Sequence, residues 1–102
     1  MDCRNQLHES MKKTFDDCYA ISLAKNHDYA GNEDPFANFR TSTAVGVPVE
    51  RGIMVRMMDK VSRINRLIDN EAQVKDESLM DTCNDLINYA AILKAYLEAK
   101  NE

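Results

Sequence analysis

The chain has 102 residues, which is the length of one domain with a single hydrophobic core. Hydrophobic residues make up 44% of it and charged residues 29%, a composition that excludes a disordered or low-complexity protein. The formal net charge of −4 argues against a protein that binds duplex nucleic acid, because such proteins present a basic surface to the phosphates.

Neither a signal peptide nor a membrane span is indicated. The N-terminus has no apolar run of the necessary length, and no stretch approaches the roughly 20 apolar residues that cross a bilayer. The three cysteines, Cys3, Cys18 and Cys83, lack the short paired spacing of a zinc site and are interpreted as reduced thiols. We therefore expect a cytoplasmic protein with no membrane partner.

Apolar residues at helical spacing predict a first helix from about Gln6 to Asn26. Its apolar stripe consists of Leu7, Met11, Phe15, Cys18 and Ile21. The next segment, 27–48, holds most of the glycines and prolines and is too long for a simple turn between helices. We expect a structured connection there, with a short helical turn around Phe36 to Arg40.

A second helix is predicted from Val49 or Glu50 to about Asn70, and a third from about Asp76, whose carboxylate would cap it. The apolar stripe of the second consists of Met54, Met58, Val61, Ile64 and Ile68. The seam of the third consists of Leu79, Cys83, Leu86, Ala90, Leu93 and Leu97. The pattern predicts a single all-α domain over 1–102, a small bundle of three main helices that is completed by forming a homo-oligomer.

Three acidic residues of the third helix, Glu77, Asp81 and Asp85, follow one another at intervals of four. Carboxylates in such a row repel one another, so the row favours a cation that they share. Mg²⁺ takes oxygen ligands of this kind together with water and phosphate oxygens. The alternative is an ordinary solvent-exposed helix face.

Basic residues of the second helix could hold phosphate groups. Arg56, Lys60 and Arg63 surround Asp59, and guanidinium groups bind phosphate through paired donors. The alternative is an exposed face with ion pairs four residues apart, such as Asp59 with Arg63.

The connection adds aromatic and polar residues among turn formers. Asp28, Tyr29, Phe36 and Phe39 lie in this segment, where aromatic rings could stack on a base. Asn32, Asn38 and Arg40 could bind the edge of the base or hold its phosphates. The alternative is that Phe36 and Phe39 anchor the connection to the bundle.

The chain resembles the nucleotide-modification-associated domain found in many phage genomes, in the segments KNHDYAGNEDPFANF, VRMMDKVSRINRLI and VKDESLMDTCNDLINYAAIL. That family is related to the all-α NTP pyrophosphatases of the MazG and dimeric dUTPase type. The resemblance implies a phage source and a MazG-like, oligomeric bundle that binds a nucleotide near acidic residues. Its motifs fall on the residues named above and add Pro35, Asn88 and Tyr89. The last two belong to the element E-S-x-x-D-x-x-x-D-x-x-N-Y.

The chain departs from the MazG pattern in having fewer carboxylates. The second helix supplies Asp59 alone, where the MazG type has a cluster of glutamates, and the third has E-x-x-x-D in place of E-x-x-D. Two activities are therefore open. One is Mg²⁺-dependent hydrolysis of a nucleoside triphosphate between its α and β phosphates, and the other is binding without turnover. A binding protein could sequester an immune-signalling nucleotide, linear or cyclic, as an anti-defence protein of the phage. The third possibility is a helical oligomer that binds no ligand.

Overall fold

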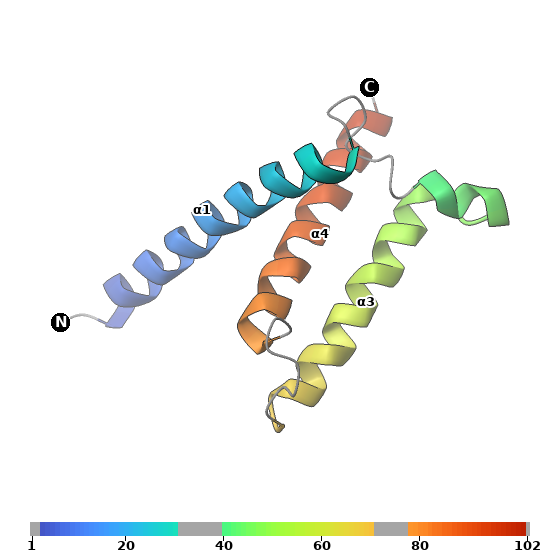
Figure 1. The fold of residues 1–102 in the computed structure, drawn as a ribbon. Helices are drawn as coiled ribbons and strands as arrows, with labels where there is room; N and C mark the ends of the chain where they lie inside the picture. Colours follow the sequence, from blue (N-terminus) through green and yellow to red (C-terminus); the bar gives the residue numbers. More distant parts are fainter. Residues whose placement is uncertain (1–2, 31–39, 71–77, 102) are drawn as a thin grey trace.

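The computed structural model describes residues 3–30, 40–70 and 78–101, and within these ranges it contains helices and no strand (Figure 1). The elements are α1 (Cys3–Ala30), the 3-10 helix η1 (Thr41–Val45), α3 (Val49–Leu67) and α4 (Leu79–Lys100). The predicted all-α class and its three main helices are confirmed. None of the described helices is long and apolar enough to cross a membrane.

Helices α3 and α4 form an antiparallel pair, and α1 packs against α4 (Figure 1). The N-terminal half of α1 extends beyond this pair. Few side chains are fully enclosed in the described part of the chain. The buried apolar residues are Cys18 of α1 with Val49 and Ile53 of α3, and the buried polar residue is Thr82 of α4.

The orientation of α3 differs from the prediction. Val49 and Ile53 are buried, and Met57, Lys60 and Ile64 follow on the same side at helical spacing and are partly buried. In the expected apolar stripe, by contrast, all members except Ile64 are exposed. The helix carries two adjoining apolar faces, and the structure turns the one that contains Ile53 toward α4.

Helix ends also differ from the prediction at two places. Helix α1 continues to Ala30, so Asp28 and Tyr29 belong to its last turn and not to the connection. No glycine or proline occurs before Gly31, which explains why the helix is not interrupted. The N-cap of α4 is Ser78 and not Asp76, because the Ser78 Oγ accepts a hydrogen bond from the Asp81 N–H at 3.1 Å.

A glycine ends the turn that leads into α3. Gly46 has a φ of +79°, in the left-handed region that favours glycine, and its N–H donates to the Thr43 carbonyl at 3.1 Å. Pro48 then occupies the N-cap position of α3, and its carbonyl accepts hydrogen bonds from the N–H groups of Arg51 and Gly52. The predicted helical turn at Phe36 to Arg40 falls almost wholly on residues 31–39, outside the described residues.

Candidate functional site

One carboxylate joins the three helices. Asp85 of α4 forms ion pairs with Lys25 of α1, at 3.3 Å from Nζ to Oδ1, and with Lys60 of α3, at 3.2 Å from Nζ to Oδ2. We call these three residues the Asp85 cluster. Asp85 and Lys60 are each less than one third exposed, so solvent screens this charge network less than it screens a surface pair. Two positively charged groups from different helices therefore share one partly buried anion.

Arg63 extends this polar region along α3. Its Nε donates to the Thr82 Oγ1 at 3.2 Å, and the Thr82 hydroxyl in turn donates to the Ser78 carbonyl at 2.8 Å. Thr82 is buried, so the hydrogen bond holds the guanidinium of Arg63 close to α4. Arg63 and Lys60 therefore both point toward α4, and each is only partly exposed.

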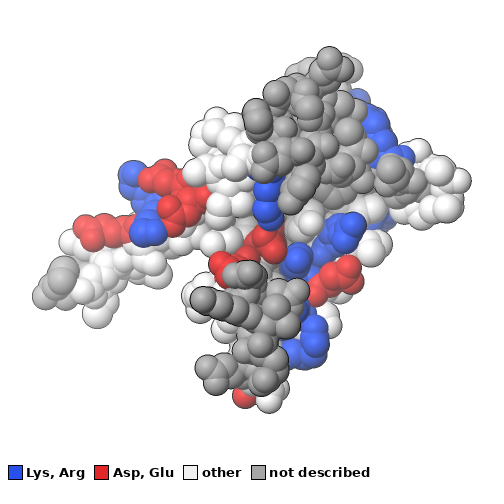
Figure 2. All heavy atoms as spheres, in the orientation of Figure 1, with Lys and Arg blue, Asp and Glu red and all other residues white. Residues whose placement is uncertain are grey.

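Arg56 and Asp59 lie nearby on α3 and are exposed. Asp59 forms no ion pair with Arg63 or with any other residue of the described ranges, so the expected pair between residues 59 and 63 is not formed. Figure 2 shows basic and acidic side chains next to one another in the middle of this face of the molecule. Among the charged residues of this part of α3, Arg56 and Asp59 are thus exposed, whereas Lys60 and Arg63 are engaged with α4.

The predicted acidic row divides into residues with different roles. Asp81 is exposed and stabilises the start of α4, since the Ser78 Oγ donates to its Oδ2 at 2.8 Å. Asp85 is engaged by Lys25 and Lys60. Glu77 lies outside the described residues. Asp81 and Asp85, the two that the structure describes, therefore do not point toward a common ion as predicted.

The carboxylates of the described residues fit a magnesium ion poorly. No group of three His, Cys, Asp or Glu side chains gathers within residues 3–30, 40–70 and 78–101. A divalent cation would have to displace two ammonium groups from Asp85, and Asp81 is hydrogen-bonded within its own helix turn. Magnesium binding through Glu77 remains a prediction from the sequence.

The other predicted ligand-binding residues are only partly placed. Asn88 is half-buried on α4, three residues after Asp85 and therefore on a neighbouring part of the same side. Asp28 and Tyr29 are placed by their helical backbone alone. Phe36, Asn38 and Phe39 lie outside the described residues, so the predicted stacking on a base is not tested.

Lys25 was not among the predicted residues, although the sequence holds a signal for it. It follows Cys18 by seven residues, which is two helical turns, so both lie on the same side of α1. Cys18 is buried against α4, and its Sγ lies 3.6 Å from the Asn84 Oδ1 and 3.7 Å from the Asn84 carbonyl oxygen. Lys25 is itself 53% exposed, and its ammonium group reaches Asp85 from this side of α1.

The cysteines behave as the sequence predicts. All three are free thiols, and burial raises the pKa of Cys18 above its ordinary value, with smaller contributions from Asp17 and Asp85. A thiol with a raised pKa is mostly protonated at neutral pH and is a poor nucleophile. We therefore assign no reactive role to Cys18 and consider the charged side chains of this face as the groups that could bind a ligand.

No family model, no curated protein and no solved structure matches the chain. The arrangement of its own residues is therefore the basis of the functional proposal.

Proposed function

We propose that the face around the Asp85 cluster binds the phosphate groups of a nucleotide and holds the nucleotide without hydrolysing it. The observation that carries the proposal is the convergence of Lys25 and Lys60 on one carboxylate, with Arg63 fixed beside them by Thr82. Ammonium and guanidinium groups held at a defined position before the ligand arrives are what recognition of phosphate requires.

The charge of this region supports an anionic ligand. Among the described residues the cations are Lys25, Arg56, Lys60 and Arg63, and the carboxylates are Asp59, Asp81 and Asp85. The region is thus positive although the whole chain is negative at −4. A local excess of positive charge on an acidic protein favours a small anion over a long polyanion, because the rest of the surface repels the latter.

The state of Asp85 favours binding over hydrolysis. Its two oxygens are each paired with an ammonium group, so the carboxylate already serves as the anion of the site. An arriving phosphate can replace it at the lysines, whereas a catalytic Mg²⁺ would need the same carboxylate freed from both. Hydrolysis in the manner of MazG-type pyrophosphatases is the other candidate, and its metal would be held by Glu77 and Asp81, with Asp59 as a further ligand. In a phage, retention without turnover would remove a signalling nucleotide from the host.

The proposal is tested by incubating the protein with a mixture of linear and cyclic nucleotides, and by analysing the bound fraction and the solution by mass spectrometry. We expect an intact nucleotide in the bound fraction and no new product, with the same result in magnesium and in EDTA. Appearance of a nucleoside monophosphate only in magnesium would establish the hydrolase instead. Absence of both a bound nucleotide and a new product would contradict both activities.

Substitution of the lysines tests the location of the site. Lys60→Ala and Lys25→Ala should each weaken binding of the captured nucleotide by about tenfold or more, which corresponds to about 1.4 kcal/mol. Lys12→Ala is the matched control, because Lys12 pairs with Asp16 on the exposed side of α1 at 2.8 Å. Equal losses in all three variants would show that general charge and not the Asp85 cluster attracts the ligand.

A further inference from the structure

The Asp85 cluster takes its two cations from two different helices. Lys25 belongs to α1 and Lys60 to α3, and within the described residues the backbone of α1 comes close to that of α4 but not to that of α3. Each lysine reaches a different oxygen of Asp85, Lys25 at 3.3 Å and Lys60 at 3.2 Å. A ligand that binds both lysines therefore spans α1 and α3.

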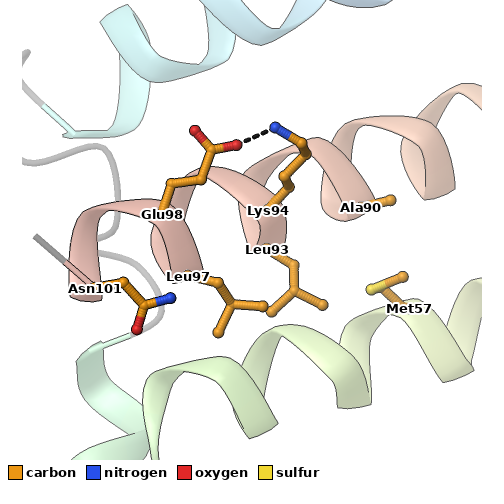
Figure 3. Close-up of a pocket in the computed structure, with 7 residues that line it drawn as sticks. All are labelled: Met57, Ala90, Leu93, Lys94, Leu97, Glu98 and Asn101. Atoms are coloured by element: carbon orange, nitrogen blue, oxygen red, sulfur yellow. Dashed lines mark hydrogen bonds and ion pairs between the residues drawn. The ribbon is translucent and has the colours of Figure 1, made fainter.

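The pair of α3 and α4 has contacts of its own that do not involve α1. Figure 3 shows Leu93 and Leu97 of α4 pointing toward α3 along a cleft of about 340 Å³. At the same end of the pair, Lys100 of α4 forms an ion pair with Glu50 of α3 at 3.3 Å. These two helices therefore form the part of the site whose position is fixed before a ligand arrives.

Helix α1 is attached to this pair more weakly. Its N-terminal half extends beyond the pair (Figure 1), and of the α1 side chains that the structure describes, Cys18 is the one that is buried. The ion pair between Lys25 and Asp85 lies two turns farther along, and a pair with a lysine that is more than half exposed stabilises a contact only slightly. A ligand that strengthens this link would therefore change how firmly α1 is held.

We infer that a phosphate group bound at the Asp85 cluster holds α1 against α3 and α4, so that ligand binding and the docking of α1 strengthen each other. This coupling rests on the proposed function, because it needs an anion at the cluster. A phosphate group carries more charge than a carboxylate and has more acceptor oxygens, so it can bind Lys25 and Lys60 at once when it replaces Asp85. Helix α1 is then linked to α3 through the ligand.

The size of the coupling follows from the contribution of Lys25 to binding. This lysine belongs to the site only while α1 is docked, so the docked state should bind phosphate more tightly than the undocked state by the tenfold factor proposed for Lys25, about 1.4 kcal/mol. Linkage requires the ligand to favour docking by the same factor. In saturating ligand, the fraction of chains with α1 undocked should therefore fall by about tenfold.

Cys18 reports on the docking of α1. Its side chain is 2% exposed and its Sγ lies 3.6 Å from the Asn84 Oδ1 of α4, so a thiol reagent reaches it when α1 separates from α4. Its rate of reaction with N-ethylmaleimide, followed by mass spectrometry of peptides, therefore measures the undocked fraction. Cys3 is exposed and serves as the internal standard for the reagent.

Inorganic triphosphate is the probe, because it offers phosphate groups without a base. We expect saturating triphosphate to slow the reaction of Cys18 by about tenfold and to leave that of Cys3 unchanged. Sodium chloride at the same ionic strength is the control, and it should accelerate the reaction of Cys18, since salt weakens the ion pair between Lys25 and Asp85. An unchanged or faster reaction of Cys18 in triphosphate overturns the inference.

Lys25→Ala separates the coupling from a general stabilisation of the fold by its ligand. The variant keeps Lys60 and Arg63, so it should still bind triphosphate, but saturation should no longer slow the reaction of Cys18. Lys12→Ala is the matched control on α1, because Lys12 pairs with Asp16 at exposed side chains, and it should keep the tenfold effect. Lys25→Gln repeats the test if circular dichroism shows that the alanine variant is unfolded. Equal slowing in wild type and in the Lys25 variant overturns the inference.

Equilibrium dialysis of triphosphate distinguishes failure of the coupling from failure of the site. Bound triphosphate together with an unchanged reaction rate of Cys18 would reject the coupling and leave the phosphate site in place. Absence of bound triphosphate would reject both. Bound triphosphate that protects Cys18 in wild type and in Lys12→Ala, but not in Lys25→Ala, is the result that we expect.

Discussion

The substitution Asp85→Asn distinguishes two roles of this carboxylate. Asp85 either occupies the place of the phosphate at the lysines or binds a metal ion. The substitution keeps the shape of the side chain and removes its charge. In the absence of ligand it removes two ion pairs of 3.2 and 3.3 Å and leaves the ammonium groups of Lys25 and Lys60 near each other. Each partly exposed ion pair stabilises a protein by about 0.2 to 1 kcal/mol, so the loss should be about 1 to 2 kcal/mol with the added repulsion. The melting temperature should fall by roughly 4 to 15 °C.

The effect on the ligand should have the opposite sign. Without the competing carboxylate, the lysines bind phosphate more strongly, and a gain of about 1 kcal/mol makes the affinity about fivefold higher. The loss of stability should therefore be recovered when the nucleotide is added. Melting curves with and without nucleotide, together with isothermal titration, measure both effects, and Asp16→Asn at the exposed Lys12 pair is the control. Weaker binding by Asp85→Asn would refute the reasoning and would favour a metal-binding role for this carboxylate.

Three further predictions concern stability and reactivity. Ser78→Ala removes the N-cap of α4 and should destabilise the protein by about 1 kcal/mol in a denaturant titration, whereas an unchanged midpoint would contradict the capping role. The pKa of Glu50 lies below its ordinary value of 4.5, chiefly because its own backbone N–H donates to it and further because Lys100 is 3.3 Å away. A lowered pKa stabilises the folded state above about pH 4.5 and ceases to do so as the pH falls through the lower folded value, so the difference in melting temperature between wild type and Glu50→Gln should shrink in acid. Cys18 should react with iodoacetamide much more slowly than the exposed Cys3 at pH 8, as followed by mass spectrometry of peptides, and equal rates would contradict its burial.

Helical spacing was enough to predict the all-α class and the approximate ends of α3, because Pro48 and the apolar periodicity mark them in the sequence. The start of α4 was placed wrongly, since Asp76 and Ser78 are both good N-caps. The choice between them depends on the hydrogen bond between Ser78 and the Asp81 N–H, which spacing does not reveal.

The side of α3 that packs inward could not be predicted from periodicity. Two apolar stripes lie next to each other on this helix, one through Ile53 and Met57 and one through Met54 and Met58. Only the packing of α4 decides between them, and it leaves the stripe through Met54 and Met58 exposed. The same rotation brings Lys60 and Arg63 toward α4.

The candidate site was predicted in part, for a related reason. Residues on one helix can be grouped by spacing, so Asp85, Lys60 and Arg63 were identified. Lys25 comes from a helix far away in the sequence, and only the packing of α1 brings it to Asp85. The role of Asp81 could not be predicted, because a carboxylate in the first turn of a helix can either stabilise the helix end or bind a ligand.

The way in which α1 is attached has a consequence for the order of folding. Helices α3 and α4 are close in the sequence, so their contacts close a short loop and can form early. Helix α1 reaches α4 through Cys18 and Lys25, which contact residues 66 and 60 positions away. These distant contacts are few, so α1 should dock late and detach first. In hydrogen exchange, the amides of α1 should therefore open through a local transition that costs less free energy than global unfolding, while those of α3 and α4 should be the slowest to exchange.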